Sequence, residues 1–485
     1  MQKKLSIILF GIIFFLFFVN PTLVFADTIT EVRPNDEKYV NGEQWGLDKI
    51  EMHKAWSITT GSKDVRVGIV DSGIVNHRDL KENIIEGIDF YWDDNDASDD
   101  STGHGTHIAG IIGAKGNNKF GIAGVCWDIT MISLQAFIET DCGDYPASKA
   151  VEYATSLYNT ADRIPILNIS LNFDKEMPEL ERAIRNYPGL VICSSGNFRL
   201  NTDEGYIYPG HYGSSLYENP LDNMIVVGNS DQNDIKAPNS NYGKKSVDLF
   251  APGQNIVSTS NVQEFKIDSG TSFAAPLVTG VAALLLSKYP NMTTSELKAS
   301  ILMNVDKVSS LSEYCTTGGR LNAYKALSNP HFHSFRYVPK TVSYHQNYCD
   351  CGMFSFPLEE HLYLGDKCAL CNAPHRHSYS IQYYNQLGHI EKCICGQTKG
   401  SPSPHVITYE DAHDGDNKAI CLGCNAELDL RYDGAQINPF SLVKRKETKN
   451  GSYILPNGII VLVEKDREAY FNGTLIFYDK LPSIR

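Results

Sequence analysis

The sequence predicts a three-layer α/β domain, in which helices cover both faces of a central parallel sheet, followed by small cysteine-rich repeats and a β-rich tail. Short runs rich in Val and Ile indicate buried strands at residues 65–70, 166–170, 190–194 and 224–228. Helical patterns at residues 148–159 and 179–186 alternate with these strands, as in parallel sheets with helical crossovers. Residues 272–288 are almost wholly apolar, which predicts a buried helix.

The chain is too long for one ordinary domain, and its 485 residues change in composition near residue 330. Residues 27–330 carry the alternating strands and helices. Residues 331–427 are rich in His, Cys and Tyr and show little helical periodicity. Residues 428–485 contain short apolar runs separated by Asn-Gly turns, which predict a small β-rich segment.

Two local patterns refine the region 27–330. Residues 27–64 are polar and are predicted to form loops, with Trp45 and Trp56 packing on the core that follows. Thr293 with Glu296 three residues later is a capping box, so we expect a helix to begin there.

The first 26 residues have the pattern of a secretory signal peptide. Lys3 and Lys4 precede an apolar run over residues 5–19, and Ala26 is the small residue expected at a cleavage site. An uncleaved membrane anchor is the alternative, but the run is shorter than the roughly 20 residues that span a bilayer. We therefore expect a secreted, extracellular protein without stable membrane insertion after signal cleavage.

Composition narrows the range of partners. The net charge of −14 argues against nucleic acids and anionic membranes, because binding to either requires basic patches. We expect the mature protein to be a monomer.

Four short segments place chemically active side chains at strand ends or helix starts. Asp71 ends the first strand, and His104 opens a predicted helix. Ser272 opens the long apolar helix, and Asn197 follows the strand at residues 190–194. A serine hydroxyl needs a base to take its proton, an imidazole suits that task, and a buried carboxylate orients the imidazole. A side-chain amide can donate a hydrogen bond to the oxyanion that forms.

The motifs around these residues resemble those of the subtilisin family of serine peptidases. In the family's order they are Asp71-Ser-Gly, Gly103-His-Gly-Thr-His, Ser194-Ser-Gly-Asn and Gly270-Thr-Ser. The resemblance spans residues 34–328 and is closest to the thermitase branch, through Pro34-Asn-Asp, Gly121-Ile-Ala-Gly and Gly319-Arg-Leu-Asn-Ala-Tyr-Lys.

The resemblance implies a serine endopeptidase that acts on polypeptides through an acyl-enzyme. Ser272 would be the nucleophile, His104 the general base and then acid, and Asp71 the group that orients His104. Asn197 would be the oxyanion donor. The alternative is a binding or scaffold protein built on a catalytically silent fold of this family.

The sequence departs from the family pattern in three places. Phe273 replaces the Met that usually follows the serine, and Asn172 stands where Gly is usual, beside the expected substrate strand. A side chain at Asn172 would narrow the subsites before the cleaved bond. Residues 27–33 leave no room for the inhibitory propeptide that subtilisins usually carry, so the activation route stays open.

The resemblance also implies bound calcium. Asp36, Asp79 and Asn118 match positions that hold this ion in the thermitase branch, and oxygen ligands suit it. The alternative is that Asn118 belongs to a simple turn. A second calcium site is implied at Asp89, Asp94, Asp96 and Asp100, with a solvated acidic loop as the alternative.

The His- and Cys-rich region repeats itself at an offset of 44 residues. The residues of the first block, each of which recurs 44 residues later, are His331, His333, His345, Cys349, Cys351 and His361. Each block closes on Cys-x-x-Cys-Asn-Ala, at Cys368 and again at Cys421, 53 residues later. The second block therefore holds nine additional residues.

The duplicated Cys-x-Cys and Cys-x-x-Cys motifs predict a pair of zinc-ribbon-like sites. The predicted ligands are Cys349, Cys351, Cys368 and Cys371 in the first block and Cys393, Cys395, Cys421 and Cys424 in the second. The His residues would complete further sites or replace a thiolate, and disulfides are the competing interpretation in an exported protein. The other cysteines, Cys126, Cys142, Cys193 and Cys315, are expected to be buried apolar side chains.

Overall fold

The computed structural model describes residues 30–138, 141–340 and 344–360 and, beyond these, strands and short segments between residues 363 and 478. The predicted signal peptide lies outside the described residues. The chain divides into two compact units, and the division falls within the segment between helix α10 (Ala323–Ser328) and strand β14 (Arg336–Pro339).

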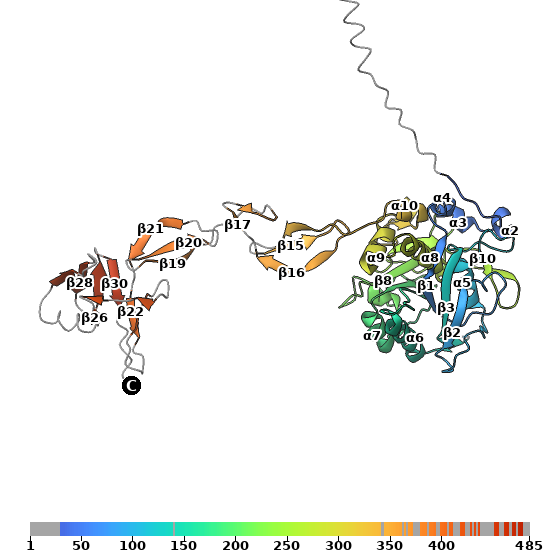
Figure 1. Ribbon diagram of the computed structural model, residues 1–485, viewed down its shortest axis with the longest axis horizontal. Coiled ribbons are helices and arrows are strands. Elements are labelled where there is room, and N and C mark those ends of the chain that lie inside the picture. The colour runs from blue at the N-terminus through green and yellow to red at the C-terminus, as the bar shows by residue number, and fades with distance from the viewer. Residues whose placement is uncertain are drawn as a thin grey trace, which may run out of the picture. The chain divides into compact units, whose positions relative to one another are not determined.

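A nine-stranded sheet forms the centre of the first unit (Figure 1). Its spatial order is β12 (Asp306–Lys307), β13 (Gly319–Arg320), β9 (Leu249–Pro252), β8 (Met224–Ser230), β7 (Leu190–Ser194), β6 (Ile166–Ile169), β1 (Gly61–Asp71), β3 (Asp128–Gln135) and β2 (Ile84–Asp89). Neighbouring strands from β13 to β2 are parallel, and β12 is antiparallel to β13. The predicted parallel sheet, with four strands at the expected places, is confirmed.

Helices cover both faces of this sheet, as predicted. One face packs against α5 (His104–Gly113), α8 (Thr271–Lys288), α9 (Thr294–Leu302) and α10, and the other against α6 (Asp144–Leu157) and α7 (Pro178–Asn186). The capping box is present, because the Thr293 hydroxyl accepts a hydrogen bond from the backbone N–H of Glu296 and the Glu296 carboxylate accepts one from the backbone N–H of Thr293. The helix α6 begins four residues before the predicted start.

The buried parts of the central strands are mostly apolar because alternate residues enter two separate cores. In β1, Val67 and Ile69 pack beneath α8, whereas Val70 packs beneath α6. In β7, Ile192 and Val191 divide between the two cores in the same way. The remaining short elements of this unit are β4 (Phe137–Ile138), β5 (Asp141–Cys142), β10 (Ile256–Thr259), β11 (Phe265–Asp268), η1 (Gly210–Gly213) and η2 (Ser309–Leu311).

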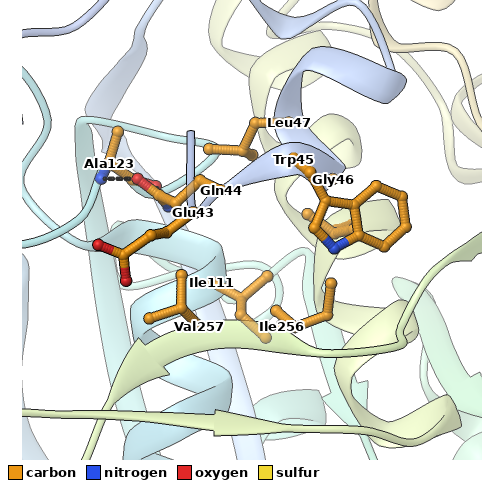
Figure 2. Close-up of a pocket in the computed structure, with 10 residues that line it drawn as sticks. Glu43, Gln44, Trp45, Gly46, Leu47, Ile111, Ala123, Ile256 and Val257 are labelled. Atoms are coloured by element: carbon orange, nitrogen blue, oxygen red, sulfur yellow. Dashed lines mark hydrogen bonds between the residues drawn. The ribbon is translucent and has the colours of Figure 1, made fainter. Parts of the chain in front are cut away.

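The N-terminal segment of this unit is helical in part, although its sequence predicts loops. It forms α2 (Glu37–Val40), α3 (Trp45–Lys49) and α4 (Met52–Ala55). Tertiary contacts stabilise these helices of one turn: Gln44 exchanges two hydrogen bonds with the backbone of Ala123, at 2.7 and 2.8 Å (Figure 2). Trp56 is buried and donates to the Val125 carbonyl at 2.9 Å, so its predicted packing is confirmed.

The hollow between Trp45, Ile111 and Ile256 measures about 20 Å³, enough for a water molecule.

Among the described residues, α8 alone is long and apolar enough to cross a membrane, and 89% of that stretch is buried inside the unit.

Three of the scattered cysteines, Cys126, Cys193 and Cys315, are buried as predicted. Burial raises the pKa of each of these thiols, which argues against a thiolate nucleophile. The side chain of Cys142 lies outside the described residues.

The second unit contains two small antiparallel sheets whose hydrogen-bond registers repeat at 44 residues. The first is β14, β15 (Tyr344–Tyr348) and β16 (Phe354–Glu360), and the second is β19 (Tyr379–Asn385), β20 (Gly388–Cys393) and β21 (Thr398–Pro404). Arg336 pairs with Tyr348 in the first sheet, and Ser380 pairs with Lys392 in the second. The internal duplication is therefore present in the backbone as well as in the sequence.

The closing hairpins of the two blocks correspond too. Tyr363 pairs with Cys368 between β17 (Tyr363–Leu364) and β18 (Lys367–Cys368), and Ile407 pairs with Cys421 between β22 (Ile407–Glu410) and β23 (Lys418–Cys421). A seven-stranded sheet then joins β22, β23 and β24 (Glu427–Leu428) to β27 (Gly451–Ile454), β28 (Ile460–Glu464), β29 (Glu468–Phe471) and β30 (Thr474–Tyr478). The short pair β25 (Arg431–Tyr432) and β26 (Ala435–Gln436) stands apart. The tail is β-rich as predicted. Its sheet also includes β22 and β23, which precede the predicted start of the tail at residue 428.

Candidate active site

The site is built where parallel strands of the first unit end. Asp71 is the last residue of β1, Ser170 follows β6, and Asn197 follows β7. Because β1, β6 and β7 are adjacent and parallel, their carboxyl ends meet at one edge of the sheet. The helices α5 and α8 bring His104 and Ser272 to the same edge.

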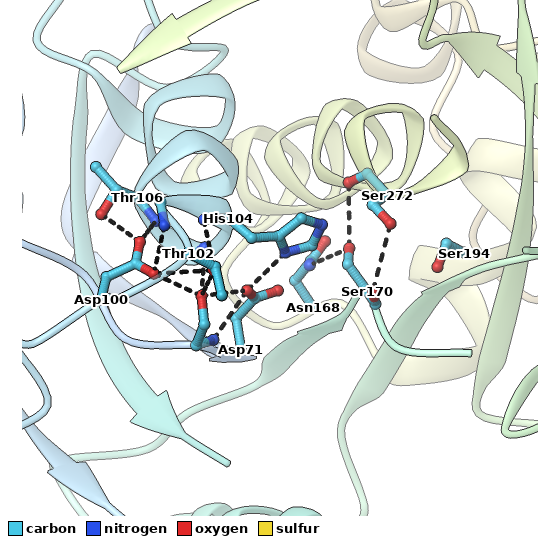
Figure 3. Close-up of polar contacts among 12 residues, drawn as sticks. Asp71, Asp100, Thr102, His104, Thr106, Asn168, Ser170, Ser194 and Ser272 are labelled. Carbon is cyan, nitrogen blue, oxygen red and sulfur yellow. Dashed lines mark hydrogen bonds and ion pairs between the residues drawn. The ribbon is translucent and has the colours of Figure 1, made fainter. Parts of the chain in front are cut away.

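The side chains of Asp71 and His104 form a short, partly buried pair. The Nδ1 atom of His104 lies 2.7 Å from Oδ1 of Asp71, which is 1% exposed. A carboxylate can only accept, so Nδ1 carries the proton and the other ring nitrogen has the lone pair. In Figure 3 that second nitrogen faces Ser272. The imidazole is therefore oriented as a base toward the serine.

Close backbone approach is needed to form this pair. A Cβ atom at Gly105 would lie 2.2 Å from the carbonyl oxygen of Gly73, so only glycine allows α5 to start against the loop after β1. The backbone N–H of Gly105 donates to the Ser72 hydroxyl at 3.0 Å, and the N–H of Ser72 donates to Asp71 at 2.9 Å. The carboxylate is thus fixed by the residue beside it.

Opposing effects set the charge of His104. Burial lowers its pKa, but the negative charge of Asp71 and the hydrogen bond to it outweigh burial, so the pKa is raised above its usual value. The ring of Phe273 lies against both His104 and His107, at centroid distances of 5.5 and 4.5 Å. Burial lowers the pKa of His107 to about 4, so that His107 stays neutral beside His104.

Ser272 lies in the first turn of α8 and is 6% exposed. Its hydroxyl donates to the Ser170 carbonyl at 3.4 Å, and the Ser170 hydroxyl donates to the Ser272 carbonyl at 3.2 Å. Behind them, Asn168 donates to the Ser170 hydroxyl at 2.9 Å and accepts from Thr279 of α8 at 2.8 Å. This network, drawn in part in Figure 3, holds the N-terminus of α8 against the end of β6.

The amide of Asn197 is oriented by Thr271. Its Oδ1 atom accepts from the backbone N–H and the hydroxyl of Thr271, at 2.9 and 3.1 Å. The NH₂ group of Asn197 is therefore available to donate into the cleft that Asn197 lines with His104 and Ser170. Gly196 makes the turn into this position at φ +99°, and a Cβ there would lie 2.5 Å from Asn241.

The model of the subtilase family matches residues 62–326 of the chain. The chain belongs to the subtilase family. Thermitase from Thermoactinomyces vulgaris is 36% identical over 301 residues, which are 61% of this chain and 99% of that protein. The thermophilic serine proteinase of Bacillus sp. (strain AK1) is 34% identical over 300 residues, 61% of this chain and 69% of its own.

Among solved structures, a protease of Pseudoalteromonas arctica PAMC 21717 is similar, with a TM-score of 0.54 and 25% identity. The similarity covers 61% of this chain and 99% of that one. The expected resemblance to subtilisins and thermitase is thus confirmed, and this subtilase is a serine endopeptidase.

Asp100 is a residue of this subtilase site whose part the sequence did not indicate. Its carboxylate accepts five hydrogen bonds, from Ser72 Oγ at 2.7 Å, Thr102 Oγ1 at 3.2 Å, Gly103 N at 2.8 Å and Thr106 N and Oγ1 at 2.9 and 2.7 Å. These bonds fix the N-terminal turn of α5, which carries His104 (Figure 3). The signal was present as an acidic residue just before a helix, but the sequence assigned it to a possible calcium loop.

Asn172 lines the cleft of the subtilase site, at the place where the family usually has glycine. Its Nδ2 atom donates to the Ser194 hydroxyl at 2.6 Å, which ties the end of β6 to the end of β7. Its Oδ1 atom is buried and accepts no hydrogen bond from the described residues. A side chain therefore occupies space on the side of the cleft that Leu171 and Phe173 also line.

The three predicted calcium ligands of this subtilase do meet. Asp36 and Asp79 are fully buried, Asp36 accepts from the backbone N–H of Asn117 at 2.7 Å, and Asp79 accepts from the Asn118 amide at 2.9 Å. Burial raises the pKa of Asp79 to about 6, and the charge of Asp36 adds to this. Neither carboxylate forms an ion pair with a described residue, so these oxygen donors fit a divalent cation.

In the acidic loop, where a second calcium site was predicted, Asp89 and Asp96 accept hydrogen bonds within local turns. Asp89 accepts from the backbone of Tyr91 and Trp92, and Asp96 accepts from Ser98.

A second group of possible metal ligands occurs after α10. His331, His333, Cys349 and Cys351 have ligand atoms that all lie within 4.8 Å of one another. Of the eight predicted cysteine ligands, Cys349 and Cys351 are in this group, and Cys368 and Cys371 are described but lie outside it. The side chains of Cys393, Cys395, Cys421 and Cys424 lie outside the described residues.

Proposed function

We propose that this subtilase is catalytically active, with Asp71, His104 and Ser272 as its triad and Asn197 as an oxyanion donor. The observation that carries the proposal is the 2.7 Å pair of His104 and Asp71, whose second ring nitrogen faces a serine at a helix N-terminus. The groups required for acyl transfer are thus present together at one edge of the sheet.

In the first step, Ser272 Oγ attacks the carbonyl carbon of the peptide and gives its proton to His104 Nε2. Asp71 keeps Nδ1 protonated and stabilises the imidazolium that results. The Ser272 hydroxyl has a long, weak bond to the Ser170 carbonyl, at 3.4 Å, and would exchange it for a bond to His104 when it gives up its proton.

The negative charge that develops on the carbonyl oxygen is stabilised by donors held before the reaction. Asn197 supplies its NH₂ group, and the N-terminus of α8 supplies backbone N–H groups and a favourable dipole. His104 then protonates the leaving amine, and a water molecule repeats the sequence to hydrolyse the acyl-enzyme.

Two further parts of the proposal concern the whole chain. The signal pattern at residues 1–26 supports secretion, although the family includes extracellular and intracellular proteases. Calcium would be held by Asp36, Asp79 and Asn118, where it would stabilise the N-terminal segment against the loop at residue 118. The duplicated His and Cys motifs support a C-terminal zinc-binding module.

Cleavage of a peptide library by the wild type and by Ser272→Ala tests the proposal. We expect the wild type to cleave and Ser272→Ala to be inactive while keeping its fold. Equal cleavage by both would remove Ser272 from the mechanism. No cleavage by a folded, calcium-loaded wild type would favour the silent scaffold.

A further inference from the structure

Two histidines after α10 have the spacing of two ligands on one ion. Nε2 of His331 lies 3.3 Å from Nδ1 of His333. Nitrogen atoms bound at about 2.0–2.1 Å to one tetrahedral zinc ion are separated by roughly 3.3–3.4 Å. The backbone positions are fixed, because the N–H of His331 donates to the Ser300 hydroxyl at 2.8 Å and that of His333 donates to Glu296 at 3.0 Å.

The remaining ring nitrogen of His333 has a hydrogen-bond partner, as the second nitrogen of metal-binding histidines almost always does. Its Nε2 atom lies 2.9 Å from the hydroxyl of Ser295, in the first turn of α9. With Nε2 donating to this hydroxyl, Nδ1 presents a lone pair toward His331. Such an outer hydrogen bond sets both the tautomer and the ring orientation of a ligand.

Cys349 and Cys351 lie in the tight turn between β15 and β16. The backbone N–H of Cys349 donates to the Met353 carbonyl at 2.9 Å, and that of Gly352 donates to the Cys349 carbonyl at 2.9 Å. Cys349 is 2% exposed. This turn brings two sulfur ligands together within three residues.

We propose that His331, His333, Cys349 and Cys351 bind one zinc ion as a Cys₂His₂ site. Their ligand atoms lie within 4.8 Å of one another, and two thiolates with two neutral imidazoles form a ligand set typical of structural zinc. Binding releases the two thiol protons, because zinc takes the thiolates. This ligand set differs from the four thiolates predicted by sequence, since the histidines take the places of Cys368 and Cys371.

The duplication supports a ligand set that includes the histidines. His-x-His and Cys-x-Cys recur together at the same offset of 44 residues, whereas Cys-x-x-Cys recurs at 53. The His and Cys pairs have therefore kept their mutual spacing while the closing hairpin changed length. A histidine has no role in a disulfide framework, so the recurrence of His-x-His together with Cys-x-Cys favours a metal bound by both pairs.

The inference deepens the proposed zinc module, and its test does not depend on peptidase activity. Zinc per chain is measured by mass spectrometry in the full chain carrying Ser272→Ala, which prevents self-digestion. His331→Ala with His333→Ala, and Cys349→Ser with Cys351→Ser, should each lose one zinc ion per chain. Asp350→Asn is the matched control, because Asp350 lies between the cysteines but pairs with Arg336 at 2.8 Å; it should keep all the zinc.

A second variant guards against loss of zinc through misfolding. His331→Cys should retain the metal and raise the number of sulfur ligands at this site from two to three in X-ray absorption spectra, with zinc–sulfur distances of about 2.3 Å. Full zinc content in the double histidine variant would overturn the proposal, as would a disulfide at Cys349 or Cys351 in unreduced peptide maps. Inactivity of the wild type toward peptides would instead affect only the catalytic proposal.

Discussion

The two units of the chain bury different kinds of residue. In the first, aliphatic side chains from alternate strand positions fill a core on each face of the sheet. In the second, the buried residues among the described side chains are Cys349, Cys368 and Gln346. A small sheet buries little apolar surface and is rarely stable alone, so we expect metal or disulfide cross-links at the cysteines to support this unit. The first unit holds its site residues in place by packing, whereas we propose that bound zinc stabilises the second.

The largest expected effect comes from removing the catalytic serine of the first unit, a change that should leave both units folded. In subtilisin itself, loss of the catalytic serine lowers kcat by about 2 × 10⁶. We expect Ser272→Ala to have a loss of this size without a change in zinc content. Ser287→Ala, in the last turn of the same helix, is the control. The Ser287 hydroxyl donates within α8 to the Ala283 carbonyl at 2.8 Å, so activity should persist in this variant. A decrease in zinc in Ser272→Ala would show that the comparison between units is wrong.

The oxyanion donor comes next in size. For the oxyanion-hole asparagine of subtilisin, the measured loss in kcat is about 10²–10³. Asn197→Ala should show a similar loss in kcat with little change in KM, because the donor acts mainly in the transition state. Asn201→Ala is the control on the same loop, where the amide bonds to Glu204 at 3.0 Å. Equal rates for the wild type and Asn197→Ala would show that other hydrogen-bond donors stabilise the oxyanion.

How much the sequence revealed also differs between the units. Four strands of the first unit followed from local apolar runs, and Asp71, His104 and Ser272 followed from the motifs around them. Parallel topology then brings the strand ends together. The role of Asp100 did not follow, because its five bonds require the turn that only the folded loop makes. The short helices α2 to α4 were missed because side-chain contacts such as Gln44 with Ala123 stabilise them, rather than periodicity.

The duplication of the His- and Cys-rich region was readable from the sequence, but the proposed zinc ligand set was not. Spacing alone favours four thiolates, since Cys368 lies only 17 residues after Cys351. The positions of His331 and His333 depend on bonds to Ser300 and Glu296 of α9, which no spacing rule contains. Sequence patterns predict cores well because apolar periodicity is local, whereas the proposed metal site joins residues that only the folded chain brings together.

Truncation of apolar side chains compares the two units directly. Leu284, in the middle of α8, is fully buried, so Leu284→Ala should cost about 2–5 kcal/mol of unfolding free energy. Ile381 in β19 is 41% exposed, and Ile381→Ala should change stability by less than about 0.5 kcal/mol. Guanidinium unfolding in the Ser272→Ala background measures the first through Trp fluorescence, because all four tryptophans lie in the first unit. Amide exchange across β19 and β20 measures the second, and faster exchange in Ile381→Ala would indicate an apolar core there.

The fall of activity at low pH should reflect the raised pKa of His104. Its protonated ring cannot accept a proton from Ser272, so kcat/KM falls as the pH drops through that pKa, with a midpoint above about 6.5. Asp268→Asn should move the midpoint to lower pH, because Asp268 contributes to the raised value. A wild-type midpoint below 6.5, or an unmoved midpoint in Asp268→Asn, would contradict this electrostatic account.

The smallest expected effect concerns cleavage preference. Asn172→Gly removes the side chain that bonds to Ser194 at 2.6 Å and enlarges the cleft near Leu171. We expect kcat/KM for peptides with a bulky residue before the cleaved bond to rise by about 10-fold relative to small ones. Profiling both proteins with one peptide library measures this, and unchanged preferences would show that Asn172 does not shape the subsite.

A fluorophosphonate probe tests the central claim most directly, because it reacts only with a serine that its own protein activates. Applied to the folded wild type, it should label one residue per chain, identified as Ser272 by tandem mass spectrometry. The label should be absent from His104→Ala and present in the double variant Cys349→Ser with Cys351→Ser. No label on folded wild-type protein, or a label on a residue other than Ser272, would contradict the account.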